Sequence, residues 1–167
     1  MKELFNMAKS ENKKVPSEDD IIKGKVYDYK RVLVGVDDSP DAQLAYQYAV
    51  KQAKEDKSEL VIVSILEEQD VNVFTALSKE MLDQQRKTIQ ERLDKYRRVA
   101  ENSGVKSVKT LIAEGDPGET IVKQVIPQVD PDLVIVGSLS RQGVAKYFGS
   151  QAAYVAKYSP VSVLVVR

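Results

Sequence analysis

The chain has 167 residues, enough for one domain of ordinary size and too few for two typical ones. Its 43% hydrophobic and 30% charged residues are typical of a globular protein, and its 25 basic and 25 acidic residues leave no net charge to attract nucleic acid or anionic lipid. Because the sequence contains no cysteine and no histidine, it excludes thiolate and imidazole nucleophiles and the metal sites built from either ligand.

Residues 1–29 form a polar N-terminal extension that differs from the rest of the chain. They are rich in lysine and acidic residues and contain Pro16. Two interpretations remain open: a polar arm outside the domain, or a segment whose Phe5 and Ile21–Ile22 pair dock on the domain or on a second subunit. No stretch has the apolar character of a signal peptide or of a membrane span, so we expect a cytoplasmic protein without a membrane partner.

From residue 30 to residue 167, runs of apolar and β-branched residues alternate with segments of helical spacing, which predicts one domain. The runs are typical of strands that are buried on both faces. They span residues 31–36, 60–66, 108–113, 132–136 and 161–166. Because right-handed crossovers place successive strands side by side in parallel, we expect an α/β fold with a doubly wound parallel sheet and helices on both faces.

The intervening segments predict four helices. Ser39 is a suitable N-cap and Pro40 a suitable first residue of the first helix. The second helix lies within residues 70–102, where basic and acidic residues are interleaved, so we expect a solvated helix face and not a nucleic-acid-binding one. Pro127 is expected to kink the third helix or end it early. The fourth helix follows a glycine-rich loop at residues 137–150.

Ligands of doubly wound sheets bind outside the carboxyl ends of the strands. Three loops lie there, at residues 37–40, 67–70 and 137–150. The third loop leaves its strand at Gly137 and enters a helix at Gly149, so its backbone amides could bind phosphate. The alternative is a glycine-rich turn without a ligand. The chain contains neither a P-loop motif nor a GxGxxG after the first strand, which disfavours a P-loop NTPase and a dinucleotide-binding enzyme.

Asp37 follows the first strand and is a second candidate ligand at this edge. Its carboxylate could accept a hydrogen bond from a ribose hydroxyl or an adenine amine, or hold a divalent ion through phosphate oxygens. Its structural alternative is to cap the first helix. The sequence leaves both roles open.

Four segments in this order resemble the universal stress protein family: VLVGVDDSPDA, EGDPGETI, DLVIVGS and SPVSVLVVR. The resemblance covers residues 29–167. It implies a five-stranded parallel sheet in the order 3-2-1-4-5, of the Rossmann-like adenine-nucleotide-binding type. It also implies a stress-response protein that is not a conventional enzyme, and a homodimer that pairs through the final strand at residues 161–166.

One branch of that family binds ATP through a G-x2-G-x9-G-[S/T] loop. Gly137 matches its first glycine, Ser140 replaces its second, and eight residues instead of nine precede Gly149. In the ATP mode, with magnesium as a candidate companion of the phosphates, the resemblance implies that Asp37 and Ile65 contact adenine and ribose. It also implies that Val136 and Gly137 line the ribose. The phosphate-binding positions would be Ser138, Ser140, Gly149, Ser150 and the amide of Gln151.

Two functions therefore remain open. The first is a stress-response module that binds ATP and acts through dimerisation and partner contacts. The second is a dimeric interaction protein with a degenerate phosphate loop that binds no nucleotide, an alternative favoured by Ser140 and the shortened loop. An enzyme such as a phosphohydrolase is disfavoured because the chain lacks histidine, cysteine and a clustered acid–base pair.

Overall fold

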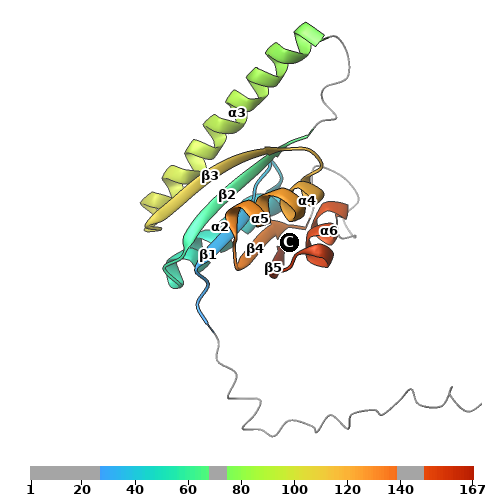
Figure 1. The fold of residues 1–167 in the computed structure, drawn as a ribbon. Helices are drawn as coiled ribbons and strands as arrows, with labels where there is room; N and C mark the ends of the chain where they lie inside the picture. Colours follow the sequence, from blue (N-terminus) through green and yellow to red (C-terminus); the bar gives the residue numbers. More distant parts are fainter. Residues whose placement is uncertain (1–26, 68–74, 139–148) are drawn as a thin grey trace, which may run out of the picture.

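The computed structural model describes residues 27–67, 75–138 and 149–167, with side chains described from residue 79 onward in the middle range. Figure 1 shows a central sheet covered by helices, with the long α3 extending past one end of it. The predicted polar extension is almost entirely outside the described residues, and Ser140 lies outside them as well.

Five parallel strands form a single sheet in the order β3-β2-β1-β4-β5. Each strand end lies within one residue of the predicted position. The strands are β1 Arg31–Gly35, β2 Glu59–Leu66, β3 Ser107–Glu114, β4 Leu133–Gly137 and β5 Ser162–Val166. This topology confirms the doubly wound fold and the strand order implied by the family resemblance.

Helices cover both faces of the sheet (Figure 1). One face packs against α2 and α3, and the other packs against α6 and the helical segments that follow β3. The helices are α2 Pro40–Glu55, α3 Thr75–Asn102, α4 Pro117–Thr120, the π-helical η2 Ile121–Val125, α5 Ile126–Val129 and α6 Ser150–Tyr158.

Alternate residues of each central strand belong to two separate cores. Val32 and Val34 pack with α2 and α3, whereas Leu33 between them packs with the opposite layer. All three side chains are completely buried. Because successive side chains of a strand point to opposite faces, a strand buried on both sides must be apolar at every position. This requirement explains why the apolar runs predicted the strands so closely.

The first helix begins as its sequence predicts. The Ser39 hydroxyl oxygen accepts a hydrogen bond from the Ala42 N–H at 3.1 Å, and Pro40 occupies the first turn. The small side chains of Ala45 and Ala49 are completely buried, so the helix packs closely on the sheet.

The helical segment after β3 does not end early at Pro127. It continues to Val129 and is followed by Asp130 in the left-handed conformation, with φ of 52°. The residues just before the proline form η2, in which the Ile126 N–H donates to the carbonyl of Ile121. Proline lacks the N–H that an α-helix needs, and the wider π-helical turn ahead of it accommodates the residue without ending the helix.

The described helices include none that is both long enough and apolar enough to cross a membrane.

Candidate functional site

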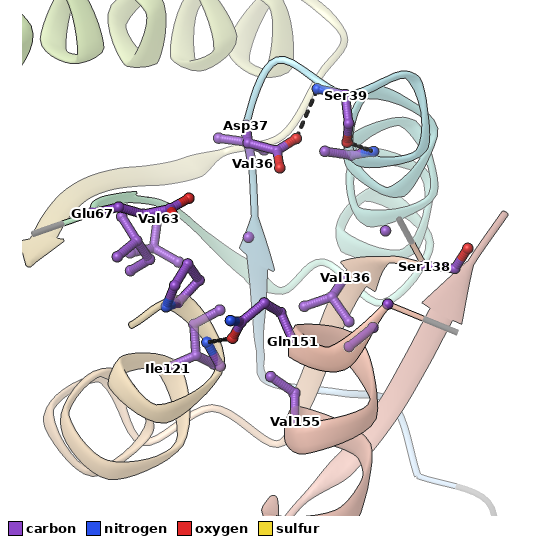
Figure 2. Close-up of a pocket in the computed structure, with 18 residues that line it drawn as sticks. Val36, Asp37, Ser39, Val63, Glu67, Ile121, Val136, Ser138, Gln151 and Val155 are labelled. Atoms are coloured by element: carbon purple, nitrogen blue, oxygen red, sulfur yellow. Dashed lines mark hydrogen bonds between the residues drawn. The ribbon is translucent and has the colours of Figure 1, made fainter. Parts of the chain in front are cut away.

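A pocket lies at the carboxyl ends of the central strands, where the strand order reverses (Figure 2). Three strand ends contribute to it through residues 35–37, residues 63–67 and residues 136–138. The first turns of α4 and α6 complete it from the opposite side. The position agrees with the edge of the sheet that the sequence predicted.

Most of the pocket wall is apolar. Figure 2 shows side chains from β2, η2, β4 and α6 facing a common space. The apolar side chains of this wall are those of Val63, Ile65, Ile121, Val136, Ala152 and Val155. An apolar wall with a few polar groups at its edge is the usual composition of a site for a small organic ligand.

Asp37 lies at the polar edge of this pocket (Figure 2). Its Oδ1 accepts a hydrogen bond from the backbone N–H of Ser39 at 2.8 Å. The carboxylate therefore shapes the turn before α2, while the N-cap itself is Ser39. Among the described residues none donates a hydrogen bond to Oδ2 of Asp37, so this oxygen is available to a ligand.

The hydrogen-bond donors of Ser138 are already used within the protein. Its N–H donates to the carbonyl of Val166 at 2.7 Å, and its hydroxyl donates to Oδ2 of Asp41 at 2.8 Å. Figure 2 shows the hydroxyl turned away from the centre of the pocket. The Ser138 carbonyl accepts from the Gly149 N–H at 2.8 Å, so the Gly149 amide is used as well.

Gly137 has a structural reason to be glycine. A Cβ at this position would lie 2.6 Å from the backbone nitrogen of Ala42 and 2.7 Å from the carbonyl carbon of Asp41. Real Cβ atoms essentially never approach backbone atoms this closely, so any other residue would push β4 away from α2. The glycine is therefore needed for packing even without a ligand.

The first turn of α6 carries amide donors that no described residue accepts from. Gly149 is its N-cap and supplies no side-chain hydrogen bond to the helix. The first intrahelical bond runs from the Ala153 N–H to the Gly149 carbonyl, so the N–H groups of Ser150 and Gln151 have no acceptor within the helix. Together with the positive end of the helix dipole, these two amides favour an anionic ligand group.

The Gln151 side chain connects α6 to α4 across one side of the pocket. Its Oε1 accepts from the Gly118 N–H at 2.5 Å, and its Nε2 donates to Oδ2 of Asp116 at 2.8 Å (Figure 2 shows the first of these bonds). Asp116 is the N-cap of α4. The side chain is thus fixed by the neighbouring helix, which leaves the backbone amide of Gln151 as its group for an anion.

Helix α3 also reaches the turn that carries Asp37. Arg92 forms an ion pair with Asp38, and within the described part of the chain its buried Nε has no hydrogen-bond partner. Burial raises the pKa of Tyr96, one helical turn further along; the charge of Arg92 lowers this pKa and the charge of Asp37 raises it. The β1–α2 turn is therefore in electrostatic contact with α3.

Known proteins match this chain in sequence and in fold. The sequence profile of the universal stress protein family matches residues 28–167. The chain belongs to the universal stress protein family. A Staphylococcus saprophyticus protein assigned to this family is 31% identical over 140 residues, which make up 83% of this chain and 84% of that protein.

Solved universal stress proteins share the fold. The structure of one from Lactobacillus plantarum has a TM-score of 0.74 and 23% sequence identity, over 86% of this chain and all of that one. Another, solved in complex with cAMP, has a TM-score of 0.63 and 24% identity, over 83% of this chain and 97% of that one.

In this universal stress protein the structure brings most of the predicted site residues together. Seven line the pocket: Asp37, Ile65, Val136, Gly137, Ser138, Gly149 and Gln151. Ser150 begins α6 but does not line the pocket, and Ser140 is outside the described residues.

The segment that follows β3 also contributes to the pocket, which we did not expect from the sequence. Pro117, Gly118 and Ile121 all line the pocket. One signal could have revealed them, because this segment follows a parallel strand and so begins at the same edge of the sheet as the predicted loops.

Proposed function

We propose that this universal stress protein is a stress-response module that binds an adenine nucleotide such as ATP at the carboxyl edge of its sheet. The observation that carries the proposal is the combination of three features in one pocket. These features are the apolar wall, the Asp37 carboxylate and the first turn of α6, whose N-cap Gly149 has no side chain to bond its amides. An adenine nucleotide has three matching parts: an apolar aromatic base, a ribose with hydroxyl donors, and an anionic phosphate chain.

Each part has a place in the pocket. The base would lie against the wall near Ile65, and Oδ2 of Asp37 would accept from a ribose hydroxyl or the adenine amine. The amide of Gln151, which lines the pocket, and the amide of Ser150 beside it would hold phosphate oxygens at the positive end of α6. The solved relative in complex with cAMP supports the choice of an adenine nucleotide. Assigning roles to these residues, and to Ser140, remains a prediction.

Magnesium would be held mainly through the phosphates. Across the residues with described side chains, no group of three or more acidic, histidine or cysteine side chains is arranged to hold a metal ion. The nucleotide's oxygens would therefore supply most of the ligands, and magnesium would neutralise phosphate charge.

We further propose that the protein pairs with a second copy through β5 and acts by binding, not by catalysis. β5 is an edge strand, and its Leu164 side chain is 39% exposed. An exposed apolar edge strand favours pairing with another strand. Within the described lining of the pocket, Asp37 and Glu67 are the only ionisable side chains, so an acid–base pair with a nucleophile is not assembled there.

A second candidate is an interaction protein of the same fold that binds no nucleotide. The specific observation in its favour is that the donors of Ser138 and the amide of Gly149 are bonded within the protein. This arrangement leaves fewer phosphate donors than the family motif implies.

Calorimetric titration with ATP and magnesium separates the two candidates. We expect micromolar binding by the wild-type chain. Asp37→Ala should raise Kd by about tenfold or more, because a hydrogen bond to a charged group contributes about 1.5–3 kcal/mol. Asp83→Ala, which removes an exposed carboxylate on α3, is the matched control and should leave Kd unchanged. Absence of wild-type binding at millimolar ATP would favour the interaction protein.

A further inference from the structure

A second groove lies between α2 and α3, on the layer of the fold opposite to α4 and α6. Its floor includes Val50 and Val99, and Val99 is 53% exposed although its side chain is apolar. Lys51 and Lys54 lie along its α2 side. The groove thus combines a partly exposed apolar strip with a basic rim, and it shares no lining residue with the pocket at the carboxyl edge of the sheet.

The basic rim is only weakly neutralised. The nearest charge pair joins Lys51 to Glu55 at 3.9 Å, with both side chains more than half exposed. Within the described residues the Lys54 ammonium makes no ion pair, and its Cε lies beside Gly104 at the end of α3. A segment that carries carboxylates next to apolar side chains would complement this surface.

The N-terminal extension joins the domain at the end of this groove. The Tyr29 N–H donates to Oδ2 of Asp56 at 2.9 Å, and the Tyr29 carbonyl accepts from the Ser58 hydroxyl at 2.7 Å. Asp56 is the C-cap of α2, directly after groove residues Lys54 and Glu55. The N-terminal extension is therefore attached to the domain next to one end of the groove.

The extension contains a segment of the complementary chemistry within reach. Residues 18–22 read Glu-Asp-Asp-Ile-Ile, three carboxylates followed by two large apolar side chains. Six residues separate Ile22 from Tyr29, and the seven steps from one Cα to the next span at most about 25 Å when the chain is extended. The groove from Gln47 to Lys54 extends about 10 Å along α2, so the segment can reach all of it.

We propose that the groove between α2 and α3 binds residues 18–22 of the same chain. Ile21 and Ile22 cover the strip formed by Val50 and Val99, and the three carboxylates face Lys51 and Lys54. The short connection to Tyr29 keeps the segment at a high effective concentration, so few contacts are enough for binding.

The test uses the full-length chain, which contains no cysteine of its own and so accepts a single engineered one. A spin label on Ser17→Cys lies just outside residues 18–22, on the side away from Tyr29, and leaves the proposed contacts intact. In isotopically labelled protein it should broaden the NMR methyl signals of Val50 and Val99. Lys51→Glu with Lys54→Glu should abolish the broadening, and adding Glu18→Lys with Asp19→Lys should restore it.

Two controls complete the design. Lys87→Glu with Lys95→Glu reverses two exposed charges elsewhere on α3 and should leave the broadening unchanged. Mixing spin-labelled chains with separate isotopically labelled chains should produce no broadening if the contact lies within one chain. The proposal is overturned if Val50 and Val99 are unaffected, if charge reversal has no effect, or if broadening occurs only in the mixed sample.

Discussion

Gln151 and Gly118 meet across one side of the pocket at the carboxyl edge of the sheet, where the side-chain oxygen of Gln151 accepts a hydrogen bond from the Gly118 N–H at 2.5 Å. The contact joins the first turns of α6 and α4, and it depends on the missing side chain at position 118. A Cβ there would lie 2.6 Å from this oxygen and 3.0 Å from the Gln151 carbonyl oxygen. The position of the proposed phosphate-binding turn is therefore set by packing against α4.

Gly118→Ala should displace the first turn of α6. The side-chain oxygen of Gln151 can move away, but its backbone carbonyl cannot move without shifting the helix. We expect a loss of about 1–3 kcal/mol in the free energy of unfolding, measured by urea denaturation, together with weaker ATP binding. Gly35→Ala is the matched control for the free energy of unfolding, because its new Cβ would meet the end of the Ile121 side chain at 3.4 Å. Equal losses in the two variants would contradict this account.

Ser138→Ala separates a structural role from a ligand-binding role. The Ser138 side chain is 4% exposed and its hydroxyl donates to Asp41, so its removal should lower the free energy of unfolding by about 1–2 kcal/mol. Because this donor is committed to Asp41, the ATP affinity of the folded variant should stay within about twofold of wild type. A larger loss of affinity without a loss of stability would show that the hydroxyl turns to the phosphates.

Arg92→Gln should weaken nucleotide binding, although residue 92 does not line the pocket. The ion pair between Arg92 and Asp38 restrains the turn that carries Asp37. We expect Kd for ATP to rise about threefold, a coupling of about 0.7 kcal/mol that is typical of a partly exposed pair. Arg86→Gln breaks a comparable pair between α3 and Glu114 on β3 and serves as the control. If Arg92→Gln and Arg86→Gln bind ATP with the same Kd, Arg92 has no positioning role.

Glu59 makes stability depend on pH in the acidic range. The hydrogen bond from Lys109 lowers the pKa of the Glu59 carboxyl group from its ordinary value of 4.5. Partial burial opposes this shift, and the hydrogen bond from Arg31 adds to it. A carboxyl group whose folded-state pKa is lowered contributes stability that is fully present above its unfolded pKa and is lost as the pH falls through the folded value.

The difference in unfolding free energy between wild type and Glu59→Gln should therefore be constant at neutral pH and shrink below about pH 4.5. Urea denaturation at a series of pH values measures it. If the difference in unfolding free energy between wild type and Glu59→Gln is as large at pH 2 as at neutral pH, the lowered pKa of Glu59 is not its cause.

The fold was largely predictable because its determinants are local. The strands are apolar at successive positions, as in Val32, Leu33 and Val34, and such runs are visible in the sequence without knowledge of their partners. The start of α2 was equally local, since Ser39 and Pro40 act within one helical turn. Of the two outcomes expected at Pro127, an early helix end does not occur, because the π-helical turn before the proline changes the hydrogen-bonding pattern there.

The details of the site were less predictable because they depend on contacts between distant residues. Gln151 meets Gly118 across 33 positions, and Ser138 meets Asp41 across 97. No periodicity or motif reports such pairings. A glycine motif likewise does not tell whether a glycine is needed for the approach of a phosphate or for packing. Gly137 is needed for packing, because β4 approaches α2 closely at this position.

The most direct test of the central claim is the titration of isotopically labelled wild-type protein with ATP and magnesium, followed by the amide signals in NMR spectra. We predict that the amides of Ser150, Gln151 and the turn around Asp37 shift together, with one dissociation constant in the micromolar range. Signals from Val99, in the groove between α2 and α3, should not shift. Unchanged spectra at millimolar ATP, or shifts confined to residues outside the pocket, would contradict the nucleotide-binding account.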